Sequence, residues 1–320
     1  MNPPKIVVPD DWPAVLGTSP AFQAFQREVT GIQYFDTLPG SPQGLIERIR
    51  DAEVVINIRS SSIFSAEVFQ NCPRLRLVSL WGTGTDNIYL PAAMQRGVTI
   101  TNTPAVSACS VAEHALALML AVARRIPAQD AAVRNGAWPR GQGLELRGKT
   151  LGIIGLGAIG RRFAELGRGI GMRVIAWTMH PNPSLDFELV EFDELLATSD
   201  VVSIHLRLTD RTKSLIGRRE FSLMKNTSIL INTARGAIVD EPALLDALST
   251  KRIAGAGLDV FTTEPLAEGH VLAALSNTVL TPHCAGITPE ALEAGLRMAV
   301  ENVRSFLKGS PVNVVAPKGD

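Results

Sequence analysis

The sequence predicts an α/β protein of two domains, each built on a doubly wound parallel sheet that helices cover on both faces. Short β-branched runs alternate with helical stretches along almost the whole chain, and this alternation favours parallel strands joined by right-handed crossovers. Several runs are almost continuously apolar, as strands buried on both faces are. The 320 residues suffice for two domains of ordinary size.

The predicted strands form two sets, one after the other along the chain. The first set is Lys5–Val8, Ile32–Phe35, Glu53–Ile58, Leu75–Leu80 and Val98–Thr101. The second set is Thr150–Ile154, Arg173–Trp177, Val201–His205, Ser228–Asn232, Gly255–Asp259 and Thr278–Thr281. Between the sets we expect a helix at Val111–Ile126 and a connecting segment, rich in Gly, Pro and Arg, at Pro127–Gly148. The predicted domains are residues 1–102, completed by the C-terminal helix in 289–320, and residues 103–288.

Composition excludes several classes of function. The 31 basic and 31 acidic residues cancel, so no global charge attracts nucleic acid or an anionic membrane. No apolar run reaches the roughly 18 residues of a membrane span, and the N-terminus does not resemble a signal peptide. Cys72, Cys109 and Cys284 are odd in number and widely spaced, which suggests a cytoplasmic protein without a disulfide framework or a structural zinc site. The histidines do not fall in HExxH spacing, and no metal is expected.

A glycine-rich loop follows the first strand of the second set. In GLGAIG, Gly155, Gly157 and Gly160 have GxGxxG spacing after an apolar strand, and a helix is expected to start directly behind them. The first glycine permits the tight turn, the second lets a pyrophosphate approach the backbone, and the third allows close packing of helix and strand. The free N–H groups of the helix then face the phosphates. The loop therefore predicts a Rossmann-type dinucleotide site, with an ordinary tight turn as the alternative.

The expected acidic residue after the next strand is missing. In dinucleotide folds a carboxylate at this strand end binds the adenosine ribose, but RVIAW is followed by Thr178. A carboxylate there would repel a 2′-phosphate, so its absence removes one barrier to NADP. No arginine stands at the same place to favour NADP, and the choice between NAD and NADP stays open.

Three further segments place reactive side chains at predicted strand ends, the edge where open α/β sheets bind ligands. Arg235 in NTARG is suited to gripping a carboxylate with two parallel hydrogen bonds. His283 in TPHCAG is a proton donor that works near neutral pH. Asp259 and Glu264 lie in DVFTTEP, and Glu264 is the candidate to orient the histidine ring. The alternative for each of these residues is an ordinary solvated position in a surface loop, without a functional role.

Together, GLGAIG, NTARG, DVFTTEP and TPHCAG in this order resemble the D-isomer-specific 2-hydroxyacid dehydrogenase family. The resemblance extends from INIRSSS near residue 60 to the terminal helix. It implies two flavodoxin- or Rossmann-like domains with the active site in the cleft between them. It also implies an NAD(P)-dependent enzyme that moves a hydride to or from C2 of a small 2-hydroxy or 2-keto acid.

The resemblance implies roles for individual residues. Arg235 would bind the substrate, His283 would be the acid/base, and Glu264 its partner. The implied cofactor-binding residues are Gly155, Leu156, Gly157, Ala158, Ile159, Gly160, Thr178, His205, Arg207, Thr212, Thr233, Ala234 and Asp259, of which Asp259 would bind the nicotinamide amide. The implied substrate-binding residues are Arg59, Ser60, Trp81, Gly82, Thr83 and Gly84. Trp81 either narrows the substrate pocket or belongs to the core.

One departure from the family bears on the cofactor. HLRLTDRT has Arg207 where many relatives have proline, in a loop that lies near the adenine end of the cofactor in the family. We hypothesise that Arg207 supplies positive charge for a 2′-phosphate.

Several functions stay open at this level. Glyoxylate or hydroxypyruvate is the first expectation for the substrate, with 3-phosphoglycerate as the alternative. Two further alternatives are a formate- or phosphite-type dehydrogenase and a non-catalytic, dinucleotide-sensing scaffold of the same fold. The family is usually dimeric, and we expect a homodimer in which the long helix after residue 110 and the extended Pro127–Gly148 segment form an arm that embraces the partner.

Overall fold

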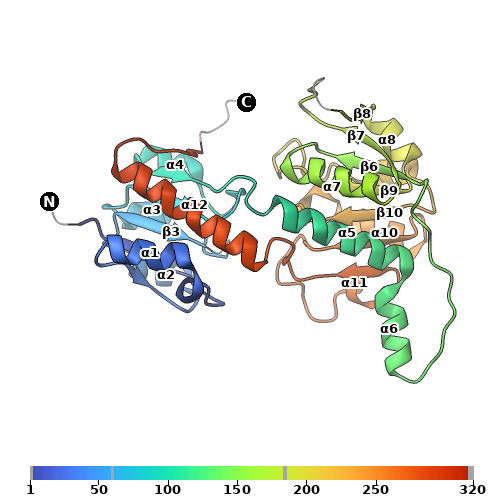
Figure 1. The fold of residues 1–320 in the computed structure, drawn as a ribbon, viewed down its shortest axis with the longest axis horizontal. Coiled ribbons are helices and arrows are strands. Elements are labelled where there is room, and N and C mark those ends of the chain that lie inside the picture. Colours follow the sequence, from blue (N-terminus) through green and yellow to red (C-terminus); the bar gives the residue numbers. More distant parts are fainter. Residues whose placement is uncertain (1–2, 59–60, 183–185, 316–320) are drawn as a thin grey trace. The chain divides into compact units, whose positions relative to one another are not determined.

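The computed structural model describes residues 3–58, 61–182 and 186–315. The chain forms two compact units, residues 1–107 with 288–320 and residues 108–287 (Figure 1). The sequence pattern placed the boundaries at 102 and 289. Each unit contains one sheet in which all strand pairs are parallel, so the predicted fold class is confirmed.

The N-terminal unit has a five-stranded sheet in the order β2-β1-β3-β4-β5, the order of flavodoxin-like folds. Its strands are β1 (Ile6–Val8), β2 (Gln33–Tyr34), β3 (Val54–Asn57), β4 (Leu77–Leu80) and β5 (Thr99–Thr101). Its helices are α1 (Pro20–Glu28), α2 (Pro42–Ile49), α3 (Ala66–Asn71), α4 (Leu90–Gln95) and α12 (Pro289–Leu307), with a short 3₁₀ turn at Leu16–Thr18.

Alternating side chains of these strands build two separate cores. On β1, Val7 packs with α2, α3 and α4 on one face, whereas Ile6 and Val8 pack with α1 and α12 on the other. The last helix thus covers one face of the first sheet, although nearly two hundred residues separate it from β5. Figure 1 shows α12 lying beside α1.

The second unit has a seven-stranded sheet in the order β12-β11-β10-β9-β6-β7-β8. Counted within the unit this is 3-2-1-4-5-6, the Rossmann order, extended by one strand. Its strands are β6 (Thr150–Ile154), β7 (Arg173–Trp177), β8 (Glu188–Leu189), β9 (Val201–Ile204), β10 (Ile229–Asn232), β11 (Gly255–Leu258) and β12 (Thr278–Leu280). The strand order reverses between β6 and β9, and ligands bind at such a switch point.

Helices cover both faces of this sheet. One face carries α5 (Ala108–Arg124) and α7 (Ala158–Gly169), and the other carries α8 (Phe192–Thr198), α9 (Arg218–Leu223), α10 (Glu241–Ser249) and α11 (Val271–Ala274). A 3₁₀ turn spans Gly236–Ile238. No helix of the described residues is both long and apolar enough to span a membrane.

Two elements differ from the sequence-based expectation. The start of the predicted connecting segment is helical, because α6 (Ile126–Arg134) follows α5 after a single residue, Arg125, whose φ of 55° breaks the helix. The strand β8 was not predicted, because Glu188 and Leu189 are both exposed and give no apolar signal.

Candidate active site

The glycine loop has the geometry of a dinucleotide cradle. Gly155 has a φ of 102°, and a Cβ there would lie 2.6 Å from the carbonyl oxygen of His205. A Cβ on Gly160 would lie 2.0 Å from the carbonyl oxygen of Gly155. Gly157 caps α7 without a side chain and has open space around it. The first amides of α7 can therefore bind phosphate oxygens, and Leu156, Ala158 and Ile159 lie in the same turn.

The next strand end is free of carboxylates, as the sequence indicates. Thr178 follows β7, half-buried, and its hydroxyl accepts a hydrogen bond from the amide of His180 at 3.4 Å.

The loop after β9 is closed by a buried threonine. The Thr212 hydroxyl donates to the carbonyl oxygen of Arg207 at 2.7 Å and accepts from the amide of Thr209 at 2.8 Å. Thr212 is therefore engaged inside its own loop, whereas Arg207 is exposed. Of the two predicted cofactor contacts in this loop, Arg207 is the one that faces solvent.

His205, the residue before this loop, turns its ring toward the protein interior. The ring lies 5.3 Å from that of Phe163, and its Nε2 is 2.9 Å from the Ser203 hydroxyl. Burial lowers the pKa of His205 to about 3, so the ring is neutral at physiological pH. His205 contributes to the cradle through its backbone carbonyl oxygen, which lies too close to Gly155 for any side chain at that position.

The end of β10 carries Arg235 on a turn that Asn232 holds. The Asn232 side chain accepts from the amide of Ala234 and donates to the carbonyl of Arg235, both at 3.0 Å. Sequence reasoning missed Asn232, although a buried amide at a strand end is a signal that could have found it. The neighbouring Thr233 hydroxyl is buried and has no hydrogen-bond partner among the described residues. A ligand that supplies a partner would remove the cost of this orphaned group.

The loops after β10 and β11 lie in direct contact. A Cβ on Gly236 would come within 2.0 Å of the backbone carbonyl carbon of Phe261. Glycine is therefore required beside Arg235, and it brings the loop that carries Glu264 against the loop that carries Arg235. The charge of Arg235 acts on Glu264 across this contact.

Asp259, at the end of β11, is fully buried and anchors the following loop. Its Oδ1 accepts from the Thr281 hydroxyl at 2.6 Å and from the Cys284 amide at 2.9 Å. Its Oδ2 accepts from the Ala285 amide at 2.9 Å, and its backbone carbonyl accepts from the His283 amide at 2.8 Å. Asp259 thus has an internal role that the sequence did not indicate.

His283 and Glu264 form the pair that the sequence suggested. His283 Nδ1 lies 2.6 Å from Glu264 Oε2, and Glu264 Oε1 accepts from the Phe261 amide at 3.0 Å. Burial opposes ionisation of Glu264, but the hydrogen bonds from His283 and Phe261 and the charges of His283 and Arg235 outweigh it and lower its pKa. His283 has a φ of 51°, a left-handed conformation that a non-glycine residue adopts at a cost. The Asp259 hydrogen bonds hold this loop in place.

In the N-terminal unit the predicted substrate residues follow β4. The Gly82 amide donates to the Thr103 hydroxyl at 2.6 Å, and the Thr83 hydroxyl donates to the Thr103 carbonyl at 3.4 Å. Gly84 continues this partly exposed turn. Arg59 and Ser60 lie outside the described residues.

Trp81 packs against the last helix. Its Nε1 donates to the carbonyl oxygen of Leu292 at 3.3 Å, and a Cβ on Gly295 would lie 1.8 Å from this nitrogen. Trp81 is half-buried on the core formed with α1 and α12.

A buried polar network, which the sequence did not indicate, contacts the backbone of Ile58 and Ser62. Asp10 accepts from the Ile58 amide at 3.2 Å and from the Asn57 side chain. Asn87 donates to the Asn57 side chain and to the Ser62 carbonyl, both at 2.9 Å. Asp10 lies two residues after the predicted strand Lys5–Val8, which is the signal that could have drawn attention to it.

Fold and site together define a dinucleotide-dependent dehydrogenase, with a phosphate cradle at the switch point and a histidine–carboxylate pair beside an arginine. Residues 116–285 match the family model "D-isomer specific 2-hydroxyacid dehydrogenase, NAD binding domain". The chain belongs to this family of NAD(P)-dependent oxidoreductases, as its motifs suggested.

Individual relatives show the breadth of the family. A glyoxylate reductase of Aeropyrum pernix is 43% identical over 87% of this chain and 87% of that protein. A D-3-phosphoglycerate dehydrogenase of Archaeoglobus fulgidus is 42% identical over 85% of this chain but only 53% of that protein. The solved structure of an acyclic imino acid reductase with NADPH and D-Arg is 32% identical, has a TM-score of 0.89, and covers 98% of this chain and 100% of that one.

The neutral His205 ring predicts a pH dependence of stability. Its pKa is about 3 in the folded chain and about 6.5 in the unfolded chain. Because only the unfolded chain gains a proton in this range, the free energy of unfolding falls as pH drops below 6.5, by about 2 kcal/mol between about pH 7.5 and pH 5. Urea titrations of the wild type and of His205→Gln at the two pH values test this. The variant should lose less stability on acidification, and an equal loss in both proteins would contradict the buried, neutral ring.

Proposed function

We propose that this chain reduces a small 2-keto acid, with glyoxylate or hydroxypyruvate as substrate, at the residues around His283. The observation that carries the proposal is the convergence of His283, Glu264 and Arg235 at the ends of β10, β11 and β12, in the unit that also carries the glycine cradle. The high identity to a glyoxylate reductase over most of both chains supports this substrate class.

The described residues fit a nicotinamide dinucleotide. The cradle formed by Gly155, Gly157 and Gly160 would hold the pyrophosphate, and the orphaned Thr233 hydroxyl and neighbouring Ala234 would meet the cofactor on the β10 side. When bound, the nicotinamide supplies or accepts the hydride. The Asp259 carboxylate is buried. We therefore propose that Asp259 contributes to nicotinamide binding indirectly, by holding the loop after β12 in position.

Residues of the chain then carry out the remaining steps, which are substrate binding and proton transfer. Arg235 grips the substrate carboxylate and polarises the adjacent keto oxygen. Glu264 holds His283 Nδ1, which leaves Nε2 as the atom that gives a proton to this oxygen. We propose that the N-terminal unit contributes Arg59, Ser60 and the turn Gly82–Gly84 to substrate binding, and that Trp81 acts indirectly by fixing that turn against α12.

A panel of keto acids tests the proposed function. Purified protein with NADH or NADPH should consume the reduced cofactor fastest with glyoxylate or hydroxypyruvate. The panel includes pyruvate and, for the alternative phosphoglycerate activity, oxidation of 3-phosphoglycerate. Replacing His283 with alanine should lower kcat by roughly 10²–10⁴ and leave the Kd of the cofactor nearly unchanged.

Two further variants make this test specific. His283→Asn serves as a second variant, because asparagine tolerates a left-handed φ and preserves the loop. His270→Ala is the matched control, since that histidine pairs with Glu241 at 3.3 Å and is not part of the His283–Glu264 pair. No turnover with any substrate, alongside tight cofactor binding, would instead favour a dinucleotide-sensing scaffold.

For the cofactor, we propose that Arg207 contacts a 2′-phosphate. Its guanidinium is exposed beyond β9, and Thr178 presents no carboxylate that would repel the phosphate. Arg207→Ala should weaken NADPH binding by up to about fivefold, as loss of one exposed ion pair does, and leave NADH binding nearly unchanged. Arg211→Ala, another exposed arginine of this loop, is the control. Fluorescence titrations measure both Kd values, and equal losses for the two cofactors would refute the assignment.

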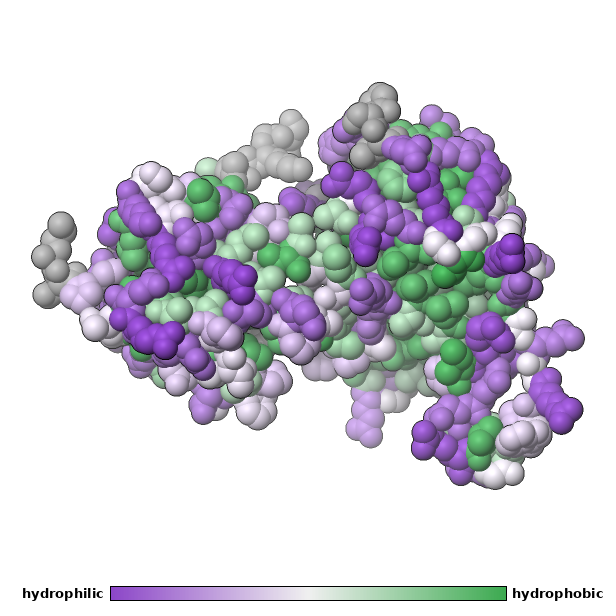
Figure 2. Space-filling model, in the orientation of Figure 1, coloured by the Kyte–Doolittle hydropathy of each residue, from purple (hydrophilic) through white to green (hydrophobic). Residues whose placement is uncertain are grey.

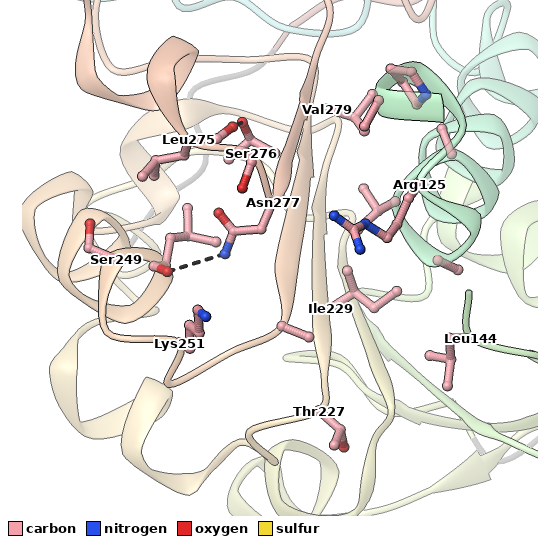
Figure 3. A pocket seen from close by; sticks show the side chains of 18 of the residues that line it. Arg125, Leu144, Thr227, Ile229, Ser249, Lys251, Leu275, Ser276, Asn277 and Val279 are labelled. Carbon is pink, nitrogen blue, oxygen red and sulfur yellow. Dashed lines mark hydrogen bonds between the residues drawn. The ribbon is translucent and has the colours of Figure 1, made fainter. Parts of the chain in front are cut away.

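We propose that the protein is a homodimer formed around α6. All residues of α6 are at least partly exposed, and Ile126, Val133 and Trp138 are 53%, 49% and 76% exposed. Beside α6 the same unit has a cavity of about 780 Å³ that runs along the starts of β10, β11 and β12 (Figure 3). Figure 2 shows apolar residues gathered over α5 near the start of α6.

In a twofold dimer each copy contributes the same surface to the interface. The exposed α6 of one copy can therefore pack into the cavity of its partner, and the partner's α6 into the cavity of the first copy. In Figure 3, Arg125, Ile229 and Asn277 border the recess from different elements. Trp138→Ser should raise the dimer dissociation constant at least tenfold in sedimentation velocity. Tyr89→Ser, which removes an exposed aromatic residue of the other unit, should have no effect. A wild-type monomer at micromolar concentration would exclude the dimer.

The three cysteines are unpaired, which agrees with the reducing cytoplasm that we propose as its location.

A further inference from the structure

Three potential metal ligands converge behind the His283 loop, on elements far apart in sequence. His114 lies on α5, Asp259 follows β11, and Cys284 follows β12. One ligand atom of each, the imidazole nitrogen, a carboxylate oxygen and the thiol sulfur, lies within 4.8 Å of the other two. All three belong to the same compact unit.

The spacing of these atoms is close to that of a tetrahedral site. With Zn–N and Zn–O bonds of about 2.1 Å and a Zn–S bond of about 2.3 Å, neighbouring ligand atoms lie about 3.4–3.7 Å apart. His114 Nε2 and Asp259 Oδ1 are already 3.5 Å apart. The sulfur of Cys284 needs to approach by about 1 Å at most, a movement within reach of one side-chain torsion.

The surroundings favour a cation. Asp259 is fully buried, and its charge acts directly on Cys284. Burial, followed by the Asp259 charge and hydrogen bond, raises the pKa of the Cys284 thiol, so sulfur carries its proton in the metal-free protein. The side chain of His114 is 22% exposed, which gives an ion a path to the site.

The existing hydrogen bonds define what changes on binding. The Thr281 hydroxyl donates to Asp259, so its oxygen accepts from His114, whose Nε2 is 2.9 Å away. Binding of a cation displaces this bond, moves the ring proton of His114 to Nδ1 and releases the thiol proton of Cys284 to solvent. The three ligands then carry two negative charges, which balance a divalent ion.

We propose that His114, Asp259 and Cys284 form a binding site for a thiophilic divalent cation such as Zn²⁺. One thiolate, one imidazole and one carboxylate select zinc and cobalt and discriminate against magnesium and calcium, which prefer all-oxygen sites. Three protein ligands leave a fourth position for water. Because the ion binds Asp259 and the residue after His283, it distorts the loop that carries the proposed acid/base; this consequence, unlike the site itself, rests on the proposed function.

Cobalt absorption tests the site directly on untagged, cofactor-free protein. A thiolate bound to Co²⁺ gives an intense near-ultraviolet charge-transfer band, and a tetrahedral ion gives visible bands. We expect both with the wild type at one Co²⁺ per chain, their loss on addition of Zn²⁺, and no effect of excess Mg²⁺. The measurement involves neither cofactor nor substrate, so failure of the proposed function would leave it unchanged.

Variants assign the ligands. Cys284→Ser and Cys284→Ala should abolish the charge-transfer band, and His114→Gln, which keeps a donor for Thr281, should weaken cobalt binding at least tenfold. Cys109→Ser is the matched control, because Cys109 is the exposed cysteine of the chain and should leave the band unchanged. Circular dichroism verifies the fold of each variant.

Three results would overturn the proposal: no band in the wild type, a band that survives in both Cys284 variants, or a band that disappears in Cys109→Ser. Inhibition of turnover by Zn²⁺ is measured in a separate assay. If the protein reduces keto acids, micromolar Zn²⁺ should lower the turnover of the wild type more than that of His114→Gln.

Discussion

Asp259 accepts hydrogen bonds from three consecutive backbone amides, those of His283, Cys284 and Ala285, through its carbonyl oxygen and both carboxylate oxygens. A buried carboxylate is costly unless such donors surround it. Charge-assisted bonds of this kind are about twice as strong as neutral ones. They offset the left-handed backbone of His283 and thereby fix where the imidazole points.

The rest of the site depends on the position of that loop. Glu264 can bind His283 Nδ1 because the β11 loop passes beside it, and the β11 loop lies there because Gly236 lets it contact the β10 loop. Three parallel strands therefore deliver three side chains to one edge. The glycine cradle lies two strands further on, after β6, at the point where the strand order reverses. The sheet topology thus places the glycine cradle and the His283–Glu264 pair along the same edge of the same unit.

The sequence predicted the strands well because six of the twelve strands among the described residues are fully buried, and strands buried on both faces tend to be runs of apolar residues. It did not predict β8, whose exposed residues carry no such pattern, or α6, whose break from α5 rests on the backbone angle of Arg125. The pairing of His283 with Glu264 was predictable from residue types at strand ends. The burial of Asp259 was not, since it arises from contacts between distant segments. Asn232 holds its turn through local hydrogen bonds, and its place at a strand end could have drawn attention to it. Trp81 had two interpretations from the sequence, as a pocket residue or a core residue. Its hydrogen bond to α12 joins segments distant in sequence, so the sequence could not indicate it.

The contact between Gly236 and Phe261 couples the position of the loop that carries Arg235 to that of the loop that carries Glu264. Arg235 and Glu264 stand on loops that have no room to slide past each other. Under the proposed function, a larger substrate cannot be accommodated by moving Arg235 away from Glu264, because the two loops would have to move together. The contact therefore fixes the spacing between the proposed carboxylate-binding arginine and the partner of the proposed proton donor. Under that function, other loops would have to adapt to differences in substrate size, while this pair of loops would hold the reacting end of each substrate in the same position.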